Sequence, residues 1–308
     1  MTAKHTVFFG DVAEDEYYVA PYFPAAGDKV IVRELERQFG GSVANSACIY
    51  AGYGMPTSFI SQLNSGSLTQ RLLSQLREQD VDTTHVIFDE DVPDSHCIVL
   101  LSGDQHIVLI PSLGITHSEI TPAAFEHMAS AEFLVTTLTD AKPFRMGDLS
   151  AAEVLEALRA RGVKIVVDLD VYNPENHDSA LLEHFDILFM NALGAERLAE
   201  SGASIPALIA HGATAVIVTR DSEGCELHFA GGVHIVPGLP VDVVDVTGAG
   251  DTFTSSFLFA YSTSGDLRDA AEFANTAASR AVTRAGARAG RATREEVEAF
   301  RAAFTTTP

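Results

Sequence analysis

Cysteine and positive charge are both scarce in this sequence. The three cysteines, Cys48, Cys97 and Cys225, lie far apart and include no Cys-x-x-Cys pair. Neither a zinc site nor a disulfide framework is therefore indicated, and the expected compartment is reducing. Only 20 lysines and arginines oppose 42 aspartates and glutamates, and the formal net charge is -22. Because binding to a phosphate backbone requires clustered basic side chains, we expect no nucleic-acid partner.

Long apolar runs and a lysine-containing phosphate loop are also missing. No stretch of about 18 apolar residues occurs, and the N-terminus lacks the apolar region and cleavage site of a signal peptide. We therefore expect a cytoplasmic protein without a membrane partner. The sequence contains no Gly-Lys pair, which excludes the G-x-x-x-x-G-K-[ST] loop of Walker-type nucleotide-binding proteins.

Short runs rich in valine, isoleucine and phenylalanine alternate with stretches of helical periodicity. Residues 149–161, for example, place leucines and an alanine on one helical face, and residues 163–168 then form an apolar run. Such alternation is typical of a mainly parallel sheet covered by helices. No internal repeat and no Pro/Gly/Ser-rich linker divides the chain. We predict a single α/β domain over residues 1–308, with a doubly wound, mainly parallel sheet flanked by helices.

Two segments depart from this alternation. Residues from about 17 to 35 and from 94 to 111 have the composition of antiparallel strands. The second segment has two β-rich halves around Ser102-Gly103-Asp104, which is a turn signal. We predict that they form a small β-sheet flap, or lid, on the main sheet, with lid segments at about residues 12–35 and 94–113.

The most informative stretch is VDVVDVTGAGDTFTSSFLFAY, residues 241–261. We predict a β-rich first part and a helix after Gly250, because apolar residues then recur at helical spacing. Gly248-Ala249-Gly250 forms the turn between them. A glycine-rich turn that enters a helix presents unpaired backbone N–H groups at the positive end of the helix dipole, and together they make an anion site.

Asp251 gives this predicted anion site its chemistry. A carboxylate beside an anion site suits phosphoryl transfer, because it can deprotonate an attacking hydroxyl while the N–H groups stabilise the transferring phosphoryl group. Two other interpretations exist. Asp251 could simply cap the helix, or the glycines could belong to a G-x-G-x-x-G dinucleotide-binding turn, although Phe253 stands in place of the third glycine.

The segment DVTGAGDTF, residues 245–253, resembles the C-terminal signature of the ribokinase-like sugar kinases, the PfkB family. Three other segments resemble motifs of this family in the same order: Gly10-Asp11 after the first apolar run, FGGSVANSA at residues 39–47, and FANTAASRAVTRAGA at residues 273–287. The resemblance covers nearly the whole chain. It implies the ribokinase-like fold, with a β-sheet lid that often pairs with a second copy to make a homodimer.

The resemblance also implies roles for individual residues. Asp251 would be the catalytic base, and the phosphate cradle for MgATP would be Gly248, Ala249 and Gly250. Residues implied to bind the sugar are Asp11, Gly40, Gly41 and Asn45. Residues implied to bind the nucleotide are Asn191, Thr219, Gly224 and Asn275. Positions implied to surround a monovalent cation, K⁺, are Asp245, Thr247, Ala281, Arg284 and Gly286.

The sequence departs from the family pattern at Gly194. The family commonly has Asn-x-x-Glu, and Asn191-Ala192-Leu193-Gly194 puts glycine in place of a glutamate associated with magnesium. Several implied site residues also have purely structural interpretations: Asp11 as a turn cap, and Gly40 and Gly41 as an ordinary turn into a helix.

The expected function is an ATP-dependent kinase that phosphorylates a hydroxyl of a small sugar-like molecule. One alternative is a nucleoside kinase of the same fold, in which the flap and the residues after Gly41 would stack on a base. The other is a ligand-binding relative that has lost catalysis. The absent glutamate favours the second alternative slightly, whereas the intact Gly-Ala-Gly-Asp sequence favours an active enzyme.

Overall fold

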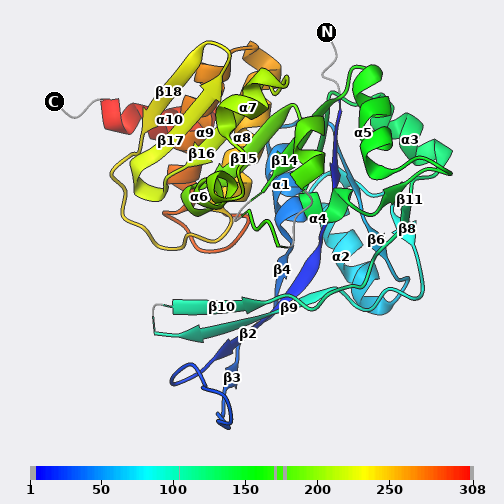
Figure 1. Cartoon of the computed structure of the whole chain (residues 1–308). Coiled ribbons are helices and arrows are strands. Elements are labelled where there is room, and N and C mark those ends of the chain that lie inside the picture. The colour runs from blue at the N-terminus through cyan, green and yellow to red at the C-terminus, as the bar shows by residue number, and fades with distance from the viewer. Residues whose placement is uncertain (1–4, 104, 170–171, 176–178, 306–308) are drawn as a thin grey trace.

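A nine-stranded sheet forms the centre of the molecule (Figure 1). The computed structural model describes residues 5–103, 105–169, 172–175 and 179–305. The strands from β16 to β7 are parallel, whereas β17 and β18 are antiparallel additions at one edge. The predicted mainly parallel α/β sheet is confirmed. Across the sheet the order is β18 (Gly232–Pro237), β17 (Gly224–Phe229), β16 (Ala215–Thr219), β15 (Ile187–Asn191), β14 (Lys164–Asp168), β12 (Phe133–Thr136), β1 (Thr6–Phe9), β5 (Thr57–Ile60) and β7 (Val81–Asp82).

The strand order reverses at β1. From β1 the chain proceeds to β5 and β7 on one side, then returns to β12 on the other side and continues through β14, β15 and β16. Parallel strands all end at the same edge of a sheet, and in open α/β sheets ligands bind outside that edge at the reversal point. The ends of β1 and β12 therefore mark the place where a ligand site is expected.

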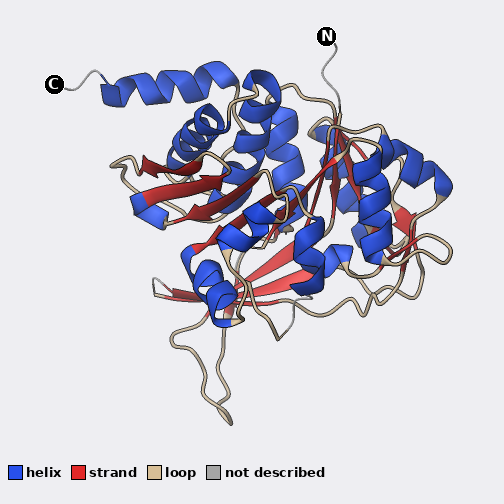
Figure 2. Cartoon of the chain, turned by 45° about the horizontal axis from the view of Figure 1, so that its top comes forward, coloured by secondary structure: helices blue, strands red, loops and turns tan. Residues whose placement is uncertain are grey.

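Alternate strand residues pack into two separate apolar cores, one on each face of the sheet. Phe8 of β1 belongs to one core, whereas Val7 and Phe9 belong to the other, as the period of two in a strand requires. Figure 2 shows helices on both faces. The first core includes residues of α1 (Ser42–Gly52), α2 (Ser67–Glu78), α8 (Ala249–Ser264), α9 (Leu267–Ala281) and α10 (Arg294–Thr305). The second includes residues of α3 (Pro122–Ala129), α4 (Leu138–Ala141), α5 (Ala151–Ala160), α6 (Ala192–Glu200) and α7 (Ile205–Ala210).

Local sequence signals set several helix boundaries. Ser150 and Glu153 form a capping box at the start of α5, so the helix predicted within residues 149–161 is confirmed. α8 ends at Gly265, whose φ of 72° is the left-handed conformation that glycine adopts readily at a helix end. Within the described residues, no helix is both long enough and apolar enough to cross a membrane.

A second sheet of five strands, which we call the flap sheet, projects from the body of the molecule (Figure 1). Both predicted lid segments contribute to it, but β2 and β9 pair in parallel, so the pairing is antiparallel only within each segment. The hairpin predicted around Gly103 joins β9 to β10, and Asp104 lies outside the described residues. The strands are β2 (Ala13–Val19), β3 (Arg33–Glu34), β4 (Gln38–Gly40), β9 (His96–Ser102) and β10 (Gln105–Leu109).

One predicted β region is wrong, and another contains less strand than predicted. Residues 241–246 form a loop between β18 and α8, and the Val244 N–H bonds to the carbonyl of Val282, at the end of α9, at 2.7 Å instead of to a strand. Between residues 17 and 35, β2 ends at Val19 and only Arg33 and Glu34 form another strand. Two prolines and a glycine lie between these strands, and prolines do not donate to a ladder.

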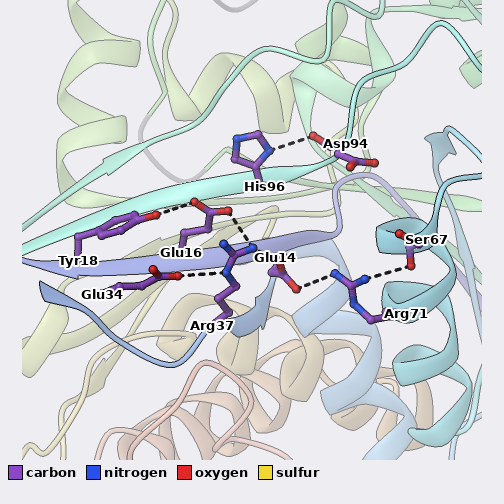
Figure 3. A network of polar contacts seen from close by, with 9 residues as sticks. All are labelled: Glu14, Glu16, Tyr18, Glu34, Arg37, Ser67, Arg71, Asp94 and His96. Carbon is purple, nitrogen blue, oxygen red and sulfur yellow. Dashed lines mark hydrogen bonds and ion pairs between the residues drawn. The ribbon is translucent and has the colours of Figure 1, made fainter.

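An ion-pair network fastens the flap sheet to the body (Figure 3). Glu14 of β2 is 8% exposed, and its carboxylate accepts hydrogen bonds from Arg37 at 2.8 Å and from Arg71 of α2 at 3.3 Å. Arg37 also forms ion pairs with Glu16 and Glu34. The network joins β2 to α2 and therefore helps to fix the flap sheet relative to the main sheet.

Two further pairs of short parallel strands complete the architecture. They are β6 (Gln62–Leu63) with β8 (Ile87–Phe88), and β11 (Ser118–Glu119) with β13 (Phe144–Arg145). A 3₁₀ helix at Ser179–His184 precedes β15, and another at Asp221–Glu223 precedes β17.

Candidate active site

The N-terminus of α8 is built on a glycine that no other residue can replace. Gly248 caps the helix with a φ of 74°, and a side chain here would collide with the carbonyl of Ala287. The N–H of Ala249 donates to the carbonyl of Val246 at 3.2 Å, so a phosphate would be met mainly by the N–H groups that follow. Around Gly250 the space is open: apart from its chain neighbours and the backbone of its own helix, no atom lies within 4 Å of the position that a Cβ would take.

Asp251 lies in the first turn of α8 and faces the first turn of α1. Its Oδ2 accepts a hydrogen bond from Nδ2 of Asn45 at 3.0 Å, and Asn45 is buried. Ser46 donates to the backbone carbonyl of Asp251 at 3.4 Å, and Ser255 donates to the carbonyl of Ser46 at 2.7 Å. The fold therefore brings together the two motifs that the sequence analysis singled out, which lie 206 residues apart.

Gly40 and Gly41 lead into α1 and pack tightly on the segment after β1. Gly41 has a φ of 94°, and a Cβ here would lie 2.6 Å from Cα of Val12. A side chain on Gly40 would collide with the carboxylate of Asp15. Close backbone packing therefore requires a glycine at Gly41, and it places the start of α1 beside the end of β1.

Asp11 follows β1, and its carboxylate binds the N-terminus of α1. Oδ2 accepts from the N–H of Ser42 at 3.0 Å, and Oδ1 accepts from the N–H of Val43 at 3.0 Å and from the Ser42 hydroxyl at 3.2 Å. Asp11 thus caps α1, whereas its purely structural interpretation expected a cap of the turn after the first strand. Its predicted contact with an acceptor remains a prediction.

Asp15 and Asp140 are two carboxylates near the site that sequence reasoning missed. Asp15 lies against Gly40, and burial, followed by the charge of Asp11, raises its pKa to about 6. Asp140, in α4 after β12, lies beside Gly10, and burial, followed by the charge of Asp11, also raises its pKa. A usable signal was present for Asp140, because it follows a strand at the carboxyl edge of the sheet.

Arg288 is the third residue that sequence reasoning missed. It lies in the loop after α9, and its Nε donates to Oδ1 of Asn45 at 2.9 Å while its Nη1 donates to the side-chain oxygen of Gln75 in α2. Burial lowers the pKa of its guanidinium, and the charges of Asp251 and Asp15 oppose this effect. No local pattern marks Arg288, because its partners come from two distant helices.

Three of the four residues predicted to bind the nucleotide lie at the ends of β15 and β16 and at the start of β17. Asn191 ends β15 and caps α6, with Oδ1 accepting from the N–H of Gly194 at 2.8 Å. Thr219 ends β16 directly beside Asn191. Gly224 begins β17 with a φ of 98°, and a side chain here would collide with the carbonyl of Val236. The fold places these residues at the same edge of the sheet as Asp11.

Asn275 lies deeper on the same side of the molecule. It is buried in α9, and its Nδ2 donates to the carbonyl of Pro237 at 2.9 Å. It also lines a cavity of about 370 Å³, together with His234, Leu239 and Phe304. Asn275 therefore fastens the loop after β18, and its contact with a nucleotide remains a prediction.

The positions predicted around K⁺ are only partly brought together. Asp245 accepts hydrogen bonds from the N–H groups of Thr247 at 2.9 Å and Gly286 at 2.8 Å. Burial opposes ionisation of Asp245, but these two bonds outweigh it and lower the pKa. Ala281 is buried at the end of α9, and Arg284 folds its guanidinium back onto a carbonyl of that helix at 2.9 Å. Over the described residues, no group of three or more His, Cys, Asp or Glu side chains is arranged to hold a metal ion.

Comparison with known proteins places this site in a family. The model of the pfkB family carbohydrate kinases matches residues 3–294. The chain belongs to this family. The kinase is 27% identical over 308 residues to a ribokinase of Haemophilus influenzae, with 96% of this chain and 98% of the relative covered. The family resemblance predicted from the separate motifs is confirmed.

Solved structures agree with this assignment. Arabidopsis thaliana ribokinase complexed with ribose and ATP matches at a TM-score of 0.81 and 25% identity, over 97% of this chain and 99% of the other. A Burkholderia thailandensis nucleoside kinase in complex with inosine matches at a TM-score of 0.79 and 20% identity, over 98% of both chains, which shows the shared fold. The protein is an ATP-dependent carbohydrate kinase with the ribokinase-like fold.

Proposed function

We propose that the kinase transfers the γ-phosphoryl group of MgATP to a hydroxyl of a small sugar or sugar-like molecule, with Asp251 as the general base. One observation carries this proposal: Asp251 stands in the first turn of α8 and bonds to Asn45 in the first turn of α1, at 3.0 Å. A carboxylate at this point lies next to a helix N-terminus suited to phosphate and next to the residues proposed for the acceptor.

The acceptor hydroxyl would be held between Asp11, Gly41, Asn45 and Asp251. Asp251 would accept the hydroxyl proton as the oxygen attacks the γ-phosphorus and ADP leaves. The backbone N–H groups of the Gly248–Gly250 turn, other than that of Ala249, would stabilise the charge on the transferring group. Asp15, against Gly40, and Asp140, beside Gly10, would add two carboxylates on the acceptor side of the site. Carboxylates accept hydrogen bonds from several hydroxyls at once, so this group of carboxylates suits a polyhydroxylated acceptor.

Two cations belong to this proposal. Magnesium bound to ATP would neutralise charge on the phosphates. Because Gly194 stands in place of the family's glutamate, Asn191 would be the polar side chain of this segment that helps to hold it. K⁺ would lie beside the ionised Asp245 and the backbone oxygens of residues 281–286. Because Asp245 already accepts two backbone N–H groups, most of the K⁺ ligands would be carbonyl oxygens.

The acceptor class decides between the sugar kinase and its nucleoside-kinase alternative. ATP consumption is measured with pentoses, hexoses, ketoses, sugar acids, polyols and nucleosides. A sugar should give the highest kcat/KM, whereas preference for a nucleoside would support the alternative. Absence of phosphorylation across the whole panel, with ligand binding retained, would favour a non-catalytic relative.

Asp251→Asn tests the catalytic assignment. We expect the variant to fold and to bind MgATP while kcat falls by roughly 10² to 10⁴, because the base is lost. Asp269→Asn is the matched control, since Asp269 occupies the equivalent position in the first turn of α9, and it should keep the wild-type kcat. Near-normal turnover by Asp251→Asn would exclude Asp251 as the base.

A further inference from the structure

Four side chains form an unbroken hydrogen-bonded chain that ends on Asp251. Gln75 of α2 accepts from Nη1 of Arg288, Nε of Arg288 donates to Oδ1 of Asn45 at 2.9 Å, and Nδ2 of Asn45 donates to Oδ2 of Asp251 at 3.0 Å. The chain runs across α2, the loop after α9, α1 and α8. The proposed base is thus linked to three other parts of the fold.

The two ends of this chain leave Asn45 only one orientation. A guanidinium has donors and no acceptor, whereas an ionised carboxylate has acceptors and no donor. The amide oxygen of Asn45 must therefore face Arg288, and the amide nitrogen must face Asp251. Without Arg288 the amide would keep only its bond to Asp251, so the plane of the amide would no longer be fixed from both ends and the carboxylate would lose a rigid partner.

The burial of the Arg288 guanidinium is not explained by fold stability alone. Its Nη2 is buried and has no hydrogen-bond partner, although buried polar groups are normally satisfied. Arg291, three residues later, gives the contrast: its guanidinium donates to the carbonyls of Cys48 and Gln79 and pairs with Asp80. Arg291 already fastens this loop to α1 and to the segment after α2.

We propose that Arg288 is a positioning residue, which fixes the amide of Asn45 and thereby aims the carboxylate of Asp251 at the acceptor hydroxyl. The inference rests on the proposed function of Asp251 as the base. Arg288 acts through Asn45, and the geometry of the carboxylate decides whether proton transfer is efficient, because small misplacements of a reacting group lower rates strongly. A variant without Arg288 should therefore bind both substrates and turn over slowly.

The first experiment needs no substrate. The side-chain amide signals of Asn45 are recorded by ¹H–¹⁵N NMR on the full chain and assigned by their loss in Asn45→Ala. In Arg288→Met, which removes the donors and keeps an apolar stem, we expect these signals to shift or broaden. In Arg291→Met, the matched control, they should stay in place even if the melting temperature falls. Unchanged Asn45 signals in a folded Arg288→Met protein would overturn the inference.

The second experiment measures coupling in turnover. Arg288→Met should lower kcat by about 10- to 100-fold with a smaller change in the acceptor KM, and Arg288→Lys, which is also only a donor, should recover part of that loss. In an Asn45→Ala background, Arg288→Met should lower kcat by less than about twofold, since residues that act as a unit are not additive. Fully additive losses would show that Arg288 does not act through Asn45.

The two experiments separate this inference from the proposed function. If the wild-type chain phosphorylates no acceptor, the proposed function fails. The NMR comparison still decides whether Arg288 fixes the orientation of the Asn45 side-chain amide. If turnover depends on Asp251 but the Asn45 amide signals are unchanged in Arg288→Met, only the inference about Arg288 fails.

Discussion

The glycines of the site serve different physical purposes, although they look alike in sequence. Gly41 and Gly248 have positive φ angles, and a side chain on either would meet backbone atoms of a neighbouring segment. Gly250, two residues beyond Gly248, has open space where its Cβ would be. Only at Gly250 can a side chain be added as a probe of the anion site without disturbing the packing around it.

Gly250→Val therefore separates binding from folding. We expect a variant that folds but loses much of the stabilisation that MgATP gives the wild type, because the side chain fills the space above the helix N-terminus. The measurement is the melting temperature with and without MgATP. Gly248→Ala is the contrast, since its side chain would collide with Ala287 and should lower the melting temperature without nucleotide. Full MgATP stabilisation of Gly250→Val would argue against this phosphate cradle.

Clustered carboxylates give the site a pH-dependent energetic cost. Burial, followed by the charge of Asp11, raises the pKa of Asp15 to about 6, from an ordinary value of 3.8. A raised carboxyl pKa means that the folded state disfavours the ionised form. The cost to stability is therefore complete above about pH 6 and disappears as the pH falls toward 3.8.

Asp15→Asn should remove that cost. At pH 8 we expect its melting temperature to exceed that of the wild type by on the order of 2 to 5 °C, and the difference should shrink as the pH falls through about 6. Asp91→Asn, at an exposed position, should show no such trend. A stabilisation that is the same at pH 8 and pH 5 would mean that Asp15 is not a strained carboxylate.

At the scale of elements, two helix N-termini and one flap converge on the end of β1. The tight glycine contacts bring α1 against the segment after β1, and the Asn45–Asp251 bond joins α1 to α8. The flap sheet is fastened by Glu14, which accepts from Arg71 of α2. We propose that the flap sheet is the lid of the site, because β2 carries Asp15 on the strand that Glu14 anchors.

Arg71→Gln should loosen this lid. Arg71 is exposed, and Glu14 keeps its ion pair with Arg37 in the variant, so the melting temperature should change little. Looser closure admits water, and ATP hydrolysis without acceptor should rise relative to phosphorylation of the acceptor. The control is Arg77→Gln, at an exposed position of the same helix. An unchanged ratio of ATP hydrolysis to phosphoryl transfer in Arg71→Gln would show that this ion pair does not control lid closure.

For the whole molecule, the flap sheet leaves an apolar strand uncovered. All five residues of β10 are exposed, including Ile107, Val108 and Leu109, and β10 is the outer strand of the flap sheet. Exposed apolar edge strands invite pairing with another chain. We propose that a second copy covers this strand in a homodimer.

Val108→Lys tests the dimer. Light scattering after gel filtration should give twice the chain mass for the wild type, and the lysine should raise the dimer dissociation constant by at least about tenfold, since an unpaired charge at an interface is costly. The control is Val233→Lys, at an exposed position of β18, and it should leave the dimer intact. A monomeric wild type would exclude the proposed interface.

The sequence by itself determined the fold class and the central motifs, because both depend on local patterns. Strand and helix periodicities alternate along the chain, and Gly-Ala-Gly-Asp at a helix start carries its own chemistry. The α/β sheet, α5 and the start of α8 follow from these patterns. The loop at residues 241–246 shows the limit: its valines favour a strand, but its backbone N–H groups bond to Val282 at the end of α9 instead.

Only the tertiary structure decided which side chains meet at the site. Burial against Gly40 and the charge of Asp11 raise the pKa of Asp15. Because β12 is the neighbour of β1 in the sheet, Asp140 lies beside Gly10. Arg288 bonds to Asn45, which is 243 residues away in sequence. It also decided that Asp11 caps α1 and that β2 pairs in parallel with β9. Burial, desolvation and pairing between distant segments arise from packing, and no local window of sequence contains them.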